Sequence, residues 1–302
     1  MRKSYEIDMC SGPLLSRILL FAIPLICSGV LQLVFNATDI IVVGRFVSSN
    51  AMAAVGSTSS LINLLVNFFI GISVGANVLV ARFRGANDFD DAQETVQTAL
   101  ITAVAGGFVL IALGILLARP MLVWMATPDE VIGQAVLYMR VYFIGMPATM
   151  LYNFGAAILR AVGDTRRPLY FLTLAGLVNV AGDLLFVLVL DMGVAGVAVA
   201  TVISQIISAT LIVLCLMRQD GMCNVNLRRM RFHRDKFLRI MQVGLPAGLQ
   251  SVIFNISNVL IQSSINSFGA TVVAGNTAAS NIEGFVYTSM NALYQTSLSF
   301  TR

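Results

Sequence analysis

Two carboxylates interrupt long apolar stretches of the sequence. Asp39 lies within the apolar run 18–43, and Asp183 lies within the run 169–190. A charged side chain in hydrocarbon is costly, so such a residue usually faces a hydrated cavity and binds an ion or a proton. The pair therefore predicts an ion-handling or proton-handling site and makes transport the leading functional hypothesis.

Polar neighbours share a helix face with each of these acids. Gln32, Asn36 and Asp39 are spaced i, i+4 and i+7, and Asn179 precedes Asp183 by four residues. Two carboxylates in a poorly hydrated cavity resist double ionisation, so the pair could accept H⁺ or Na⁺. The alternative is structural: these side chains form hydrogen bonds between helices, and Asp39 reaches to the membrane interface.

Further polar residues of the apolar runs could line the same cavity. They are Asn63 and Asn67 in the run 52–81, Asn153 in 134–158, Thr201 in 193–217 and Asn258 in 240–266. Asn and Thr also serve ordinary helix contacts, which is the alternative for each of them. Pro24 removes one backbone hydrogen bond from the first run and predicts a place where that helix can bend, although a static kink fits equally well.

The composition indicates that the elements carrying these residues are membrane helices. The chain is 57% hydrophobic and 11% charged, and its mean hydropathy is +0.84. A helix of about 20 apolar residues crosses a bilayer core of ~30 Å. Segments of this kind occur at 18–43, 52–81, 97–118, 134–158, 169–190, 193–217, 240–266 and 272–300. We therefore predict an all-α, polytopic membrane bundle of eight transmembrane helices.

The basic residues predict the orientation of this bundle. Fifteen of the 19 lysines and arginines fall in segments that are cytoplasmic if the N-terminus is inside. Lysine and arginine are retained on the cytoplasmic side during insertion, so we expect a multi-pass inner or plasma membrane protein with a cytoplasmic N-terminus. The net charge of +4 then reflects topology, and no nucleic-acid partner is expected.

The sequence repeats itself. Placing Pro24 on Pro246 brings Asn36 onto Asn258, so the seventh run restarts the pattern of the first. The expected domains are a six-helix lobe at 1–217, a basic cytoplasmic linker at 218–239, and the first two helices of a second lobe at 240–302. The second unit stops after two helices, so we expect a fragment, or a unit whose remaining helices come from elsewhere.

Several motifs resemble the multidrug and toxic compound extrusion (MATE) transporters. They are Ile23-Pro24, NATDIIVVGRF at 36–46, AILRAVGDTRRP at 157–168, NVAGD at 179–183, GVAGVAVATVISQ at 193–205 and GLPAGLQS at 244–251. The resemblance implies a twelve-helix antiporter with two six-helix lobes. Such a protein exchanges cationic or amphipathic compounds for Na⁺ or H⁺ by alternating access.

The resemblance also implies roles for particular residues. Asp39 matches the family's first-helix acid, and Pro24 matches the proline at which that helix bends. Asn179, Asp183 and Thr201 match ion-site positions of the first lobe, and Asn153 is a looser match. The expected cofactors are none beyond the coupling ion, with Na⁺ at Asp39 and Asp183 as the only metal. Many members carry a glutamate in helix seven, where this chain has Phe254-Asn255.

Two alternatives from other classes remain. A lipid-linked oligosaccharide flippase could share this architecture, but a bound pyrophosphate would favour several basic residues, and only Arg140 lies within a predicted helix. A non-transporting membrane fragment or scaffold is the second alternative, and it predicts no loss when both acids are neutralised. The only histidine is His233, and no nucleophile elbow or phosphate loop occurs, so we do not expect an enzyme. The sequence leaves the oligomeric state open.

Overall fold

The computed structural model describes residues 14–125, 127, 129–219, 224–225, 230–266 and 270–300. These residues form helices and short connections, and none of them lies in a strand. The helices are α1 (Leu14–Phe46), α2 (Ser49–Gly85), α3 (Phe89–Trp124), α4 (Asp129–Ile144), α5 (Met146–Ala161), α6 (Arg166–Leu184), the π-helix η1 (Leu185–Val189), α7 (Gly193–Arg218), α8 (Arg234–Asn266) and α9 (Ala270–Phe300). The predicted all-α class is confirmed.

The helices have the length and composition of membrane spans. Six are long and apolar enough to cross a membrane, and α4 with α5 adds a seventh if the bent pair counts as one span. The axes of α4 and α5 are bent by 51° relative to each other. The membrane bundle is thus confirmed, while the number of eight spans stays a prediction.

The break between α4 and α5 falls inside the run predicted as one helix at 134–158. The first helix ends at Ile144, Gly145 caps the start of the second, and Pro147 occupies the first turn of that second helix. A proline has no backbone N–H to donate to the preceding turn and tolerates only the start of a helix. Large buried side chains, among them Phe143 and Phe154, lie on both halves, so the broken span runs through the core.

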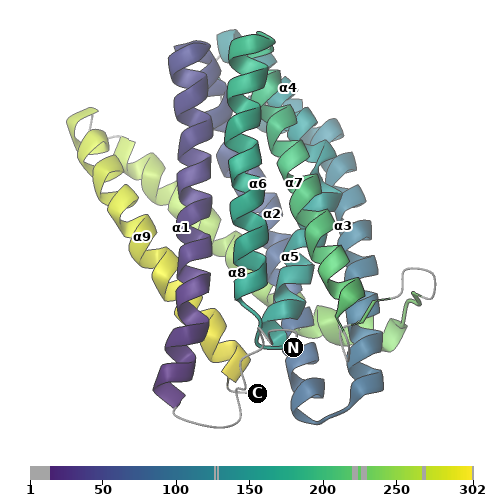
Figure 1. The fold of residues 1–302 in the computed structure, drawn as a ribbon. Helices are drawn as coiled ribbons and strands as arrows, with labels where there is room; N and C mark the ends of the chain where they lie inside the picture. The colour runs from purple at the N-terminus through teal and green to yellow at the C-terminus, as the bar shows by residue number, and fades with distance from the viewer. Residues whose placement is uncertain are drawn as a thin grey trace.

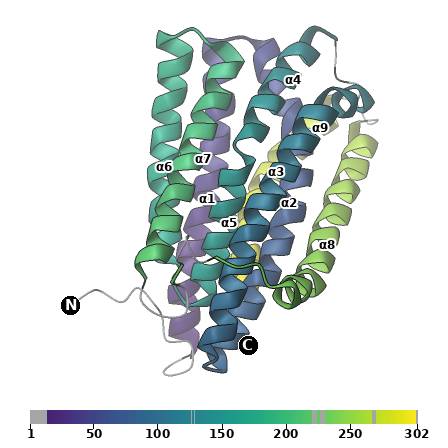
Figure 2. The same ribbon diagram turned by 90° about the vertical axis from the view of Figure 1, so that its right-hand side faces the viewer.

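The helices form one elongated bundle (Figures 1 and 2). Contacts between α1 and α6, α6 and α7, α7 and α5, α5 and α2, and α2 and α1 close a ring of spans. α8 packs along α2 on one side of the bundle, and α9 crosses α1 (Figures 1 and 2). α8 begins at Arg234, within the segment expected as linker, and the domain boundaries themselves stay a prediction.

Two pairs of glycines bring α2 and α8 into backbone contact. A Cβ atom added at Gly71 would lie 2.4 Å from the Cα atom of Gly248. One added at Gly75 would lie 2.3 Å from the carbonyl oxygen of Ile240 and 2.9 Å from the backbone nitrogen of Gly244. Small residues allow helices to approach this closely. The glycine spacing at 71 and 75 therefore serves close packing, as its sequence pattern indicates.

The last turns of the sixth helix widen directly after Asp183. α6 ends at Leu184, and the π-helix follows over Leu185–Val189. The backbone N–H of Leu190 donates to the carbonyl oxygen of Leu185 at 3.1 Å, which is the i→i+5 pattern of a π-turn. Single π-turns inside helices are frequent at functional sites.

Candidate functional site

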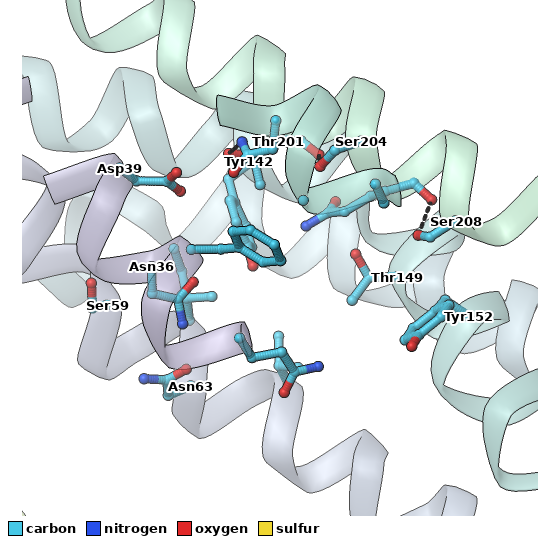
Figure 3. A pocket seen from close by; sticks show the side chains of 18 of the residues that line it. Asn36, Asp39, Ser59, Asn63, Tyr142, Thr149, Tyr152, Thr201, Ser204 and Ser208 are labelled. Carbon is cyan, nitrogen blue, oxygen red and sulfur yellow. Dashed lines mark hydrogen bonds between the residues drawn. The ribbon is translucent and has the colours of Figure 1, made fainter. Parts of the chain in front are cut away.

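A cavity of about 440 Å³ lies between α1, α2, α4, α5, α6 and α7 (Figure 3). Asp39 stands at one end of it, and Tyr152 and Ser208 stand at the other (Figure 3). Its polar lining consists of Gln32, Asn36, Asp39, Ser59, Asn63, Asn67, Tyr138, Tyr142, Thr149, Tyr152, Asn153, Asn179, Thr201, Ser204, Gln205 and Ser208. Lysine, arginine and histidine are absent from the lining residues, so the only formal charge on this wall is negative.

The two predicted acids meet beside the cavity. Asp39 is 7% exposed and lines it, whereas Asp183 is 0% exposed and is not among the lining residues. The two carboxyl groups lie within hydrogen-bonding reach of each other. Asp39 Oδ1 and both carboxyl oxygens of Asp183 accept no hydrogen bond from any donor in the described part of the chain. Such buried oxygens require a proton or a cation.

An amide and a hydroxyl stand next to this acid pair. Asn179 Nδ2 donates to Thr201 Oγ1 at 3.4 Å, and Thr201 Oγ1 donates to the carbonyl oxygen of Val197 at 2.9 Å. Hard cations prefer carboxylate, amide and hydroxyl oxygens. Within the described residues no three His, Cys, Asp or Glu side chains form a metal-binding group. The oxygen atoms of the acid pair, the amide and the hydroxyl are thus of the type that hard cations prefer.

The structure brings most of the predicted site residues together. Those that line the cavity are Gln32, Asn36, Asp39, Asn63, Asn67, Asn153, Asn179 and Thr201. Asn153 Nδ2 also donates to the carbonyl oxygen of Thr149 at 2.9 Å, so it has an ordinary helix contact as well. Pro24 lies inside α1, away from the lining. The side chain of Asn258 lies outside the described residues.

Sequence reasoning missed the aromatic part of the lining. Tyr138 and Tyr142 stack with ring centroids 5.9 Å apart, and Tyr152 follows on the other half of the broken span. Gln205 adds a carboxamide whose Oε1 atom is buried without a hydrogen-bond donor among the described residues. The i, i+4 spacing of Tyr138 and Tyr142 within an apolar run was the available signal, because it places both hydroxyl groups on one helix face.

The cavity lies closer to one end of the bundle than to the other. Asp39 is seven residues before the end of α1, or about 10 Å at 1.5 Å per residue. On α2 the lining runs from Val55 to Ile70 and stops before Gly71. The cavity thus occupies the half nearer the α1–α2 connection, and the glycine contact with α8 begins where its lining ends.

The sequence and the fold are similar to those of known proteins. A family model described as MatE matches residues 24–185. The chain is 30% identical over 276 residues to the probable multidrug resistance protein YoeA of Bacillus subtilis (strain 168), covering 88% of this chain and 59% of YoeA. It is 29% identical over 281 residues to the probable multidrug resistance protein YpnP of the same organism, covering 92% of this chain and 62% of YpnP. The chain thus spans about 60% of the length of these curated relatives.

A solved structure shares the fold. A crystal structure of MATE in the bent conformation superposes with a TM-score of 0.88 at 26% identity, covering 96% of this chain and 65% of that chain. The sequence matches and the shared fold show that this chain belongs to the multidrug and toxic compound extrusion (MATE) family.

Proposed function

We propose that the complete protein is a secondary antiporter that exports cationic or amphipathic compounds in exchange for H⁺ or Na⁺ by alternating access. Members of its family are transporters, not enzymes, and the curated relatives are named as multidrug resistance proteins. The observation that supports the coupling is the pair of buried carboxyl groups, because Asp39 Oδ1 and both carboxyl oxygens of Asp183 find no hydrogen-bond donor in the described part of the chain.

The acid pair would hold the coupling ion. Two negative charges this close together repel strongly in a poorly hydrated site, so the pair binds one proton or one cation when it faces a solution that supplies it. Asn179 and Thr201 offer further oxygens if the ion is Na⁺. Because Asp39 also lines the cavity, ion and substrate would compete for the same carboxyl group.

The remaining lining would hold the substrate. Tyr138 and Tyr142 present ring faces and hydroxyl groups, and a cation over a tyrosine ring gains about 0.5–2 kcal/mol. The carboxamides and hydroxyls can donate and accept hydrogen bonds, so they suit compounds of varied shape. Arg140 is exposed and does not line the cavity, so nothing in the lining favours the pyrophosphate of a lipid-linked oligosaccharide.

A bend in α1 would connect the uptake of the coupling ion with the release of the substrate. Pro24 lies inside α1, and the hydroxyl of Ser28 donates to its carbonyl oxygen at 2.8 Å. α1 contributes Gln32, Asn36 and Asp39 to the cavity wall. When the acids take up the coupling ion, bending at Pro24 would move this wall inward and expel the bound compound. The ion would then leave towards the cytoplasm.

The orientation belongs to the same proposal. The α2–α3, α5–α6 and α7–α8 connections lie at the end of the bundle where the basic residues gather in the sequence. By the positive-inside rule this end and the N-terminus face the cytoplasm, and the cavity lies in the outer half of a plasma membrane protein.

Neutralising the acids tests the proposal. Asp39→Asn and Asp183→Asn should each abolish ion-driven efflux of ethidium from cells while the protein still reaches the membrane. Glu283→Gln is the matched control, because Glu283 lies on α9, exposed and outside the cavity lining. Unchanged efflux in both asparagine variants would remove the antiport proposal. Efflux by the unmodified protein that does not exceed the background of cells lacking it would favour a non-transporting scaffold.

A further inference from the structure

A buried lysine joins the start of α8 to the first lobe. Lys236 is 3% exposed, although it is the third residue of α8. Its Nζ atom lies 2.6 Å from Asp91 Oδ1 and 3.7 Å from Glu94 Oε2, both on α3. The same nitrogen lies 4.9 Å from the ring centroid of Phe83 on α2. The side chain is thus inserted between α2 and α3.

The backbone that leads into α8 is tied to α3 as well. The backbone N–H of His233 donates to Thr98 Oγ1 at 3.2 Å, and its Nδ1 atom lies 3.4 Å from Glu94 Oε2. The backbone N–H of Arg231 donates to Gln97 Oε1 at 3.1 Å. These contacts fix the segment at 231–236 on the first three turns of α3.

The glycine pairs extend the contact between α8 and α2 further along both helices. Ile70 is the last α2 residue of the cavity lining, and Gly71 and Gly75 follow it in contact with the backbone of α8. A Cβ atom added at Gly244 would lie 2.6 Å from the carbonyl oxygen of Ile72. No methyl group fits between the two helices here, so α2 and α8 leave no gap beside the end of the cavity lining on α2.

We propose that Lys236, Asp91 and Glu94 form a latch that holds α8 against α2 and α3 while the cavity is closed towards the cytoplasmic end of the bundle, where the α2–α3 connection lies. Opening the cavity to this end requires the latch to break. The inference rests on the proposed alternating access and assigns that closure to named residues. α8 then separates from α2 at the glycine pairs, and water reaches the cavity between them.

The exposure of the partners explains how such a latch can break. The side chains of Asp91 and Glu94 are 34% and 38% exposed, so water replaces the lysine on them when the latch opens. Lys236 is buried in the closed form, so it contributes to closure only while its partners are charged and in place. Removing either Lys236 or its acidic partners should therefore shift the equilibrium between the closed and open forms by about tenfold towards the open form. This is a small effect for a buried lysine, because its partners are partly exposed to solvent.

Thiol labelling of the α2–α8 contact tests the latch without any drug or ion gradient. Ile72 lies on α2 against Gly244 of α8 and is 3% exposed, so Ile72→Cys provides a reporter in the complete protein. Its background replaces the native cysteines Cys10, Cys27, Cys215 and Cys223 by alanine. With N-ethylmaleimide on membranes, Lys236→Met should raise the labelling rate about tenfold. Arg239→Met, which removes an exposed charge one turn later, should leave it unchanged.

A charge exchange separates the latch from a folding defect. Lys236→Asp combined with Asp91→Lys should return labelling towards the slow rate, whereas Lys236→Asp alone should not. If Lys236→Met does not reach the membrane, Asp91→Asn with Glu94→Gln gives the same comparison. Equal labelling rates with and without the latch overturn the inference and leave the antiport proposal standing. If Asp39→Asn and Asp183→Asn leave efflux unchanged while the labelling rates still differ, the antiport proposal is overturned and the latch is retained.

Discussion

Replacing Asp183 by asparagine should make the protein more resistant to heat, although it removes part of the proposed coupling site. Asp183 is 0% exposed, and no donor within the described residues reaches either of its carboxyl oxygens. The side chain therefore lacks the hydrogen bonds that would compensate its burial. An asparagine has nearly the same shape and carries no charge beside Asp39.

The magnitude follows from the distance between the two acids. Two unit charges about 3 Å apart repel by about 5 to 6 kcal/mol at an effective dielectric constant of about 20. The folded pair avoids this cost by keeping one proton, which an isolated aspartate releases near pH 4. Keeping it costs about 1.4 kcal/mol for each pH unit above that value, or about 3 kcal/mol at pH 6 and 5 to 6 kcal/mol at pH 8.

The sign of the pH dependence is then fixed. We expect the folded pair to bind a proton that the unfolded chain has released, so the stability of the unmodified protein should fall as the pH rises. Asp183→Asn removes this dependence. Its advantage should grow by about 2.7 kcal/mol from pH 6 to pH 8, and about 2 to 4 °C of Tm accompany each kcal/mol in a chain of this size class.

Thermal unfolding in detergent is the assay, with choline chloride as the only salt. Adding Na⁺ at 100 times its Kd should raise the stability of the unmodified protein by about 2.7 kcal/mol if Na⁺ binds the pair, and should not affect Asp183→Asn. Asp191→Asn is the matched control, because Asp191 is exposed and its φ of 50° suits asparagine. A Tm advantage that stays constant between pH 6 and pH 8 would refute the reasoning.

Three further changes probe the helices around the site. Pro24→Ala should lower the ethidium efflux rate severalfold and leave ethidium binding intact, because α1 loses its bending point. Asn77→Leu should lower the free energy of unfolding by about 1–3 kcal/mol, because a buried carbonyl oxygen of α5 loses its donor at 2.8 Å; urea unfolding measures it. Gly107→Ala should cost about 1–3 kcal/mol, because its Cβ would lie 2.4 Å from Pro147 Cα, whereas Gly133→Ala, with nothing within 4 Å, should cost nothing.

The polar face of α1 could be predicted because helical spacing alone places its residues together. Gln32, Asn36 and Asp39 line the cavity, as do Asn179 and Thr201 from two other helices. Polar residues are rare in a membrane segment, so each one is easily recognised as a candidate for the cavity wall. This is why a short sequence pattern identified most of one cavity wall.

The aromatic wall could not be predicted in the same way. Tyr138 and Tyr142 look like ordinary apolar residues of one long run, and only the break at Gly145 and Pro147 turns the span so that both halves face the cavity. The position of Asp183 next to Asp39 also depends on how two distant helices pack, which spacing along one chain does not contain. Lys236 lies in the segment expected as a basic cytoplasmic linker, and its burial arises from tertiary contacts with α3.

The widened turn at Leu185–Val189 determines where this helix can gain or lose a residue. One residue removed from the π-turn would restore ordinary α-helical winding and leave the preceding carboxyl group in place. One residue removed between Asn179 and Asp183 would instead swing that group by about 100° around the helix axis, away from Asp39. Tolerance to length changes should therefore be confined to the few positions after the acid, and related sequences should place their alignment gaps there.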